Sequence, residues 1–121
     1  MKITIPMNEP DLKSGVCPSF GRAPYFLFCD TDTNQSRWIE NSAAESSSGA
    51  GIQAAQILAD QGANALIALR CGENAEKVLR GAEITVYRAQ DGTTKKNIDA
   101  LTAGKLIPLS KFHAGFHGHG G

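Results

Sequence analysis

Apolar and polar positions at the start of the chain follow patterns that predict three strands. Residues 3–5 alternate, are β-branched and precede a proline, which predicts a short strand. The continuous apolar run 25–29 predicts a central strand covered on both faces. Turn residues at 30–34 connect this run to a predicted hairpin partner over 37–40.

In the rest of the chain, helical patterns alternate with strand patterns. Ile52, Ala55, Leu58 and Ala59 are spaced as on one face of a helix, and Gly62 is placed to cap its C-terminus. The other predicted elements are a buried strand over 65–69, a helix N-capped by Asn74 and ended by Gly81, a strand over 84–87 and a helix over 94–103. Such alternation implies parallel pairing with right-handed crossovers, whereas the opening hairpin implies antiparallel pairing. The sequence therefore predicts an α/β fold with a mixed sheet between helices.

Three irregular stretches connect these elements and are rich in glycine, serine and cysteine. They are residues 7–23, 41–51 and 70–74. If the first, third and fourth strands are parallel, all three loops emerge at one edge of the sheet, where open α/β sheets bind ligands. Cys17 and Cys71 would then meet over one crevice.

The cysteines have both a functional and a structural interpretation. Cys71 directly precedes a helix N-terminus, where partial positive charge favours a thiolate, and Arg22 and Arg70 could add charge for an anion. Equally, Cys17 and Cys71 could be small buried residues. Cys29 lies within an apolar run and is expected in the core.

Composition excludes several classes of protein. The 121 residues suffice for one domain, and 12 basic side chains balance 12 acidic ones, so no overall field attracts nucleic acid or a membrane. We expect a cytoplasmic protein, since no stretch resembles a signal peptide or reaches the roughly 20 apolar residues of a membrane span. The three cysteines include no CxxC pair, which argues against a disulfide framework and a paired-ligand zinc site.

The histidines lie in a glycine-rich end that has no periodicity. We predict a cofactor-binding domain over 1–107 and a flexible tail over 108–121. His113, His117 and His119 could weakly capture Cu²⁺, Ni²⁺ or Zn²⁺, or have no specific role. No predicted element holds a base beside a nucleophile, so we predict a binding protein rather than an enzyme.

Several motifs carry a family resemblance. They are Phe20-Gly21-Arg22-Ala23-Pro24-Tyr25-Phe26 before a strand, Gly49-Ala50-Gly51-Ile52 opening a helix, Gly62-Ala63 before 65–69, and Gly72 with Ala75 before Gly81 and 84–87. With this order and spacing, the chain resembles the dinitrogenase iron–molybdenum cofactor biosynthesis (NifX-type) family from about residue 1 to 106.

The resemblance implies a ribonuclease H-like sheet of five strands in order 3-2-1-4-5, with the second strand antiparallel and helices on its faces. Family members are associated with carrying or inserting iron–molybdenum cofactor and its precursors. Small stand-alone relatives include the orange protein of sulfate reducers, which holds a mixed molybdenum–copper sulfide cluster. The implied cargo is therefore a molybdenum-containing sulfide cluster, with or without copper, or a cofactor precursor, and the implied partner is a protein that receives it.

The resemblance and the loop positions together assign the expected site. Cofactor-binding residues are expected at Cys17, Ser19, Phe20, Arg22, Ser48, Gly49, Gly51, Cys71 and Gly72, and metal ligands at Cys17, Cys71, His113, His117 and His119. Many relatives have a histidine where this chain has Ser19, and another near Ser46, where it has none. Two binding modes stay open: thiol ligands, or an anionic cluster held by Arg22, backbone N–H groups and apolar contacts.

Two functions follow as alternatives. The first is a monomeric carrier of a metal–sulfur cluster that binds neither nucleic acid nor membrane. The second is a regulatory or interaction module that keeps the scaffold without metal. A nuclease is disfavoured, because no acidic cluster accompanies the fold.

Overall fold

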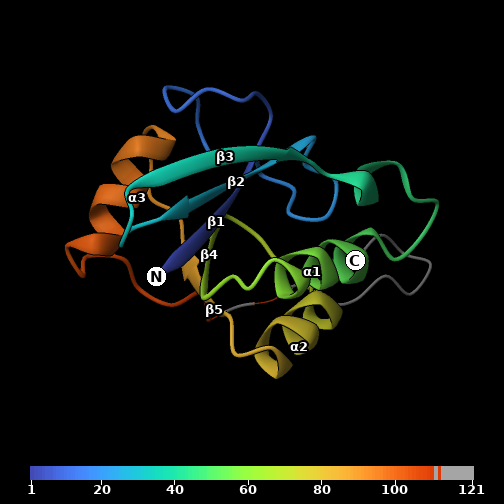
Figure 1. Ribbon diagram of the computed structural model, residues 1–121. Helices are drawn as coiled ribbons and strands as arrows, with labels where there is room; N and C mark the ends of the chain where they lie inside the picture. Colours follow the sequence, from blue (N-terminus) through green and yellow to red (C-terminus); the bar gives the residue numbers. More distant parts are fainter. Residues whose placement is uncertain (111, 113–121) are drawn as a thin grey trace.

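A computed structural model, which describes residues 1–110 and 112, has a five-stranded sheet in the order β3-β2-β1-β4-β5 (Figure 1). The strands are β1 (Lys2–Met7), β2 (Tyr25–Asp30), β3 (Gln35–Glu40), β4 (Ala65–Ala68) and β5 (Thr85–Arg88). β2 pairs antiparallel with β1 and β3, whereas β4 pairs parallel with β1 and β5. The predicted strand order and the antiparallel second strand are confirmed.

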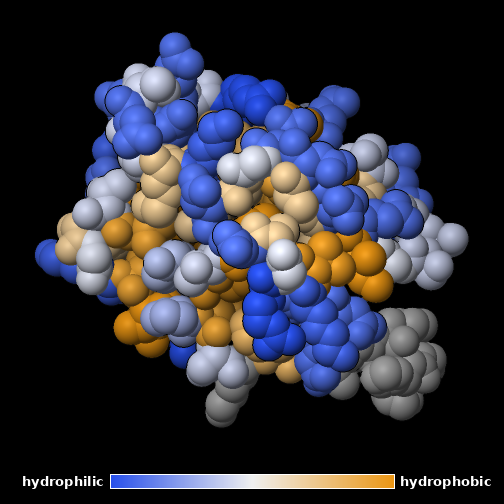
Figure 2. Space-filling view, turned by 60° about the horizontal axis from the view of Figure 1, so that its bottom comes forward, coloured by the Kyte–Doolittle hydropathy of each residue, from blue (hydrophilic) through white to orange (hydrophobic). Residues whose placement is uncertain are grey.

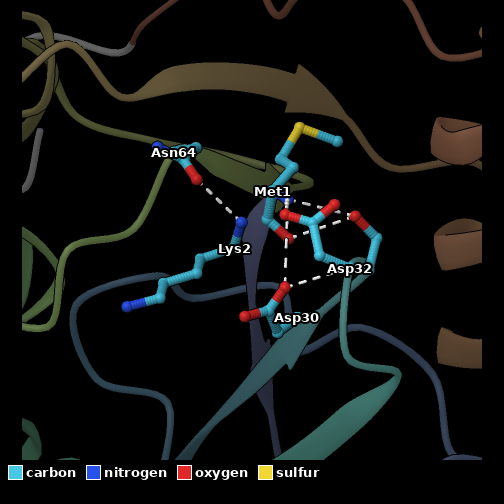
Figure 3. Close-up of polar contacts among 6 residues, drawn as sticks. Met1, Lys2, Asp30, Asp32 and Asn64 are labelled. Atoms are coloured by element: carbon cyan, nitrogen blue, oxygen red, sulfur yellow. Dashed lines mark hydrogen bonds and ion pairs between the residues drawn. The ribbon is translucent and has the colours of Figure 1, made fainter.

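Polar contacts hold the start of β1 at the centre of the sheet (Figure 3). The terminal amine of Met1 donates to Asp32 Oδ2 at 3.0 Å, on the turn between β2 and β3. The backbone N–H of Lys2 donates to Asn64 Oδ1 at 2.7 Å, just before β4. The two neighbours of β1 are thus fixed to the same end of this strand.

Helices cover both faces of the sheet (Figure 1). Helices α1 (Ala50–Asp60) and α2 (Glu73–Gly81) lie on one face, α3 (Thr94–Thr102) lies on the other, and a 3₁₀ turn, η1 (Ser42–Glu45), precedes α1. α1 starts within the predicted helix entry at 49–52. α2 has Gly72 as its N-cap, so the prediction of Asn74 as the N-cap was wrong. Gly72 has extended backbone angles, as an N-cap requires, while Asn74 already lies in the first helical turn.

Two apolar clusters form the core, one on each face of the sheet. Phe26, Leu58 and Leu66 belong to the cluster beneath α1 and α2, which also contains Cys17 and Cys71. Cys29 lies in the other cluster, beneath α3, as its apolar surroundings predict. Large apolar side chains also remain at the surface, and Figure 2 shows apolar patches between polar ones.

The chain beyond α3 lies along the outer edge of β5. Arg88 N donates to Ile107 O at 2.8 Å, and Leu109 N donates to Val86 O at 2.9 Å. Leu109 and Phe112 pack against the core cluster beneath α1 and α2. The predicted boundary between the domain (1–107) and the tail (108–121) therefore falls within a segment that contacts the sheet. Within the described part of the chain, no helix has the length and apolar character to cross a membrane.

Candidate functional site

Three loops meet at one edge of the sheet and enclose a cleft of about 460 Å³. These loops follow β1, β3 and β4, whose C-terminal ends point the same way because of the strand pairing. The predicted convergence of the loops is confirmed. The cleft is lined by residues 18–22, 47–52, 70–72, 74 and 75.

Asn41 joins the first loop to the second. This side chain is 5% exposed, and its Nδ2 donates to the carbonyl oxygens of Gly21 and Ala23, each at 2.9 Å. Its Oδ1 accepts a hydrogen bond from Ala43 N at 3.0 Å, so the same side chain caps η1. Both polar ends of a buried amide are thereby satisfied, which stabilises one arrangement of the two loops.

Arg22 joins the same two loops, but here the donor lies in the first loop and the acceptors lie in the second. Its Nη1 donates to Ala44 O at 3.0 Å and to Ser46 O at 2.9 Å. A guanidinium has five N–H donors, and these two bonds engage only those on Nη1. The side chain therefore stabilises the second loop through hydrogen bonds and also lines the cleft.

The first loop also contacts the backbone at the start of α1. A Cβ built on Gly21 would lie 2.7 Å from Gly51 N and 2.8 Å from Gly51 Cα. These separations are well below van der Waals contact, so only glycine allows this approach. On its other side, Gly51 faces α2, because a Cβ there would lie 3.4 Å from Ala75 Cβ. A glycine contact thus places the first loop against α1, and a second places α1 against α2.

Two helix N-termini open into the cleft. α1 begins after Gly49 and α2 after Gly72, and neither helix has a hydrogen-bonded side-chain cap in the described structure. Gly49 has a φ of 69°, a left-handed conformation that glycine adopts without strain. The first N–H groups of a helix lack partners within the helix and carry partial positive charge. With Arg22 and Arg70, they make the cleft suitable for an anion.

Cys71 lines the cleft but is protonated near neutral pH. It is 1% exposed, and burial, followed by the charge of Glu76, raises its pKa from 9.0 to about 12. The prediction that the α2 N-terminus favours the thiolate was therefore wrong. The loss of hydration of a buried charge outweighs the partial charge of a helix end. Among the described residues, its Sγ donates one hydrogen bond, a long one of 3.6 Å, to Gly72 O.

The loop positions predict that Cys17 and Cys71 meet over one crevice, and for Cys17 this prediction was wrong: Cys71 lines the cleft, but Cys17 does not. It is 5% exposed and belongs to the core cluster beneath α1 and α2. Among the described residues, no group of three or more His, Cys, Asp or Glu is placed to hold a metal ion. His113, His117 and His119 lie outside the described residues.

The remaining predicted residues do come together at the cleft, which is lined by Ser19, Phe20, Arg22, Ser48, Gly49, Gly51, Cys71 and Gly72. Sequence reasoning missed Asn41, whose position before a serine- and glycine-rich stretch resembles an ordinary turn. It also missed Ile52, which helical spacing assigned to the buried face. In the structure Ile52 is 44% exposed and lines the cleft.

Comparisons with known proteins agree with this architecture. The family model "Dinitrogenase iron-molybdenum cofactor" matches residues 1–104. An uncharacterized protein of Methanocaldococcus jannaschii is 30% identical over 109 residues, which cover 88% of this chain and 89% of that protein.

Solved structures with the same fold also come from proteins similar to this chain in sequence. The apo form of the orange protein from Desulfovibrio gigas has a TM-score of 0.85 and 31% identity, over 90% of this chain and 92% of that one. A candidate NifB protein from Thermotoga, of the DUF35 family, has a TM-score of 0.79 and 37% identity, over 92% of this chain and 95% of that one. From residue 1 to 104, the chain belongs to the dinitrogenase iron–molybdenum cofactor family.

Proposed function

We propose that the cleft binds an anionic, molybdenum-containing sulfide cluster, with or without copper, or a precursor of the iron–molybdenum cofactor. The protein would carry this cargo unchanged and pass it to a recipient protein. One observation carries the proposal: two helices without side-chain caps begin at a single cleft that Arg22 and Arg70 also line. Membership of the family supports the same type of cargo.

The donor groups of the cleft suit an anion better than a bare metal ion. The described residues include no cluster of three or more metal-ligating side chains, and Cys71 is the one cysteine of the described chain that lines the cleft. Since the pKa of Cys71 is raised to about 12, a metal would have to displace its proton to gain a thiolate ligand. Of the two binding modes, these features support the one based on charge and backbone N–H groups.

Arg22 is the side chain best prepared to hold such a cargo. Its Nη1 is fixed by the carbonyl oxygens of Ala44 and Ser46, so the guanidinium is oriented before the anion arrives. Charge-assisted hydrogen bonds from guanidinium are directional and can be paired. A group oriented in advance loses less entropy on binding, which increases affinity.

The histidines remain part of the proposal as an auxiliary site. His113, His117 and His119 are close enough in sequence to share one Cu²⁺, Ni²⁺ or Zn²⁺ ion. We propose that this metal and the cargo of the cleft bind independently of each other. A chain that ends after Phe112 should therefore lose this metal and keep the molybdenum cargo.

The test is metal retention after desalting. Untagged protein is mixed without oxygen with tetrathiomolybdate, with and without copper, and molybdenum is measured together with the absorption spectrum. We expect the wild-type chain, Cys17→Ser and Cys71→Ser to retain molybdenum with a charge-transfer band. Arg22→Lys should bind about tenfold more weakly, because lysine cannot reproduce the charge-assisted hydrogen bonds of guanidinium.

Arg88→Lys is the matched control, because Arg88 is exposed on β5 and does not line the cleft. Equal losses in Arg22→Lys and Arg88→Lys would contradict the role of Arg22. If the wild-type chain retains no molybdenum under any mixture, the carrier function is wrong. In that case the metal-free interaction module becomes the better hypothesis.

A further inference from the structure

Ile52 occupies an unusual position for a large apolar side chain. It is the third residue of α1, where a polar side chain commonly caps the helix. It is 44% exposed and lines the cleft rather than the core. The first turn of α1 contains no acidic residue, whereas that of α2 contains Glu73 and Glu76, so the N-terminus of α1 is the better anion site of the two.

The first loop adds further apolar surface to the same cleft. Pro18 and Phe20 line it beside Arg22, and Ala75 lines it from α2. Phe20 is held in place by the core, since it is 4% exposed and its ring centroid lies 5.6 Å from that of Phe26. The cleft therefore combines positive charge with apolar surface, which is an unfavourable combination for a strongly hydrated ion.

Resting on the proposed function, we infer that Ile52 is a specificity-determining residue, which makes the cleft prefer a sulfide anion to an oxyanion of the same charge and shape. An oxyanion accepts strong hydrogen bonds from water, and an isoleucine side chain cannot replace them. A sulfide anion is larger and more polarisable, and it loses less hydration against an apolar surface. The N–H groups of the cleft supply attraction, while Ile52 discriminates between the two kinds of anion.

The experiment compares tetrathiomolybdate with molybdate, because both are tetrahedral dianions. Equilibrium dialysis without oxygen gives a dissociation constant for each anion. The constant for molybdate divided by the constant for tetrathiomolybdate measures the preference for the sulfide anion. Ile52→Ser should reduce this ratio by about tenfold, because it removes most of the apolar contact and adds a hydroxyl donor. Ile52→Leu keeps the apolar surface and should retain the preference.

Ile107→Ser is the matched control, since Ile107 is 63% exposed but lies outside the cleft. It should leave the ratio unchanged. The inference is wrong if Ile52→Ser leaves the ratio unchanged, or if Ile107→Ser lowers it equally, while the wild-type chain still binds tetrathiomolybdate. If the wild-type chain binds neither anion, the proposed function itself is wrong, so the two failures are distinguishable.

Discussion

The contact between Gly21 and Gly51 gives the sharpest test of how the cleft is built. In Gly21→Ala the new Cβ would lie 2.7, 2.8 and 3.0 Å from Gly51 N, Gly51 Cα and Ala50 C. Gly21 does not have the left-handed φ that would itself penalise alanine, so the cost arises from overlap alone. All three neighbours are backbone atoms at the start of α1, and no rotamer change can move them away.

The expected cost follows from these distances. Carbon atoms rest at about 3.5–4.0 Å, so the first loop or α1 must move by several tenths of an ångström or more. Overpacking of this kind typically lowers the free energy of unfolding by about 1–3 kcal/mol. A loss of about 2 kcal/mol would move the urea midpoint by roughly 1 M, given the usual dependence for small domains. The displaced loop should also weaken retention of tetrathiomolybdate.

Urea unfolding followed by circular dichroism provides the assay, and Gly81→Ala provides the control. A Cβ at Gly81, the last residue of α2, meets nothing within 4 Å. Alanine there should leave stability unchanged or raise it by up to about 1 kcal/mol. The reasoning is refuted if Gly21→Ala unfolds at the wild-type urea concentration, or if both variants lose stability equally.

Two further predictions concern stability. Because burial raises the pKa of Cys71 from 9.0 to about 12, the folded chain keeps a proton that the unfolded chain loses in this range. The free energy of unfolding should therefore fall as the pH rises from 9 to 12, and Cys71→Ala should show a shallower fall; identical slopes would contradict the assignment. Ending the chain after Ile107 rather than after Phe112 removes the bond from Leu109 N to Val86 O and two apolar side chains. This truncation should cost about 1–3 kcal/mol in urea unfolding, and equal midpoints for the two chains would show that the segment adds nothing.

Sequence reasoning succeeded where a feature depends on neighbouring residues and failed where it depends on residues far apart in sequence. The apolar run at β2 and the helical spacing in α1 are local patterns, and both elements formed where predicted. The protonation of Cys71 depends on burial beneath α1 and α2 and on Glu76, neither of which its own loop reveals. The position of Ile52 is a similar case, because the first loop leaves a cleft where helical spacing alone predicts core.

The sequence by itself determined the elements, the mixed α/β class and the edge of the sheet at which three loops meet. These features depend on periodicity and chain direction, which each segment carries within its own residues. Only the tertiary structure decided which side chains face the cleft, that Asn41 and Arg22 join the same two loops, and that two helix N-termini share one site. These features depend on contacts between segments distant in sequence. Such contacts form over a few ångströms, and the pattern within a single segment does not contain them. One of these contacts, Gly21 against Gly51, exists only because Gly21 has no side chain.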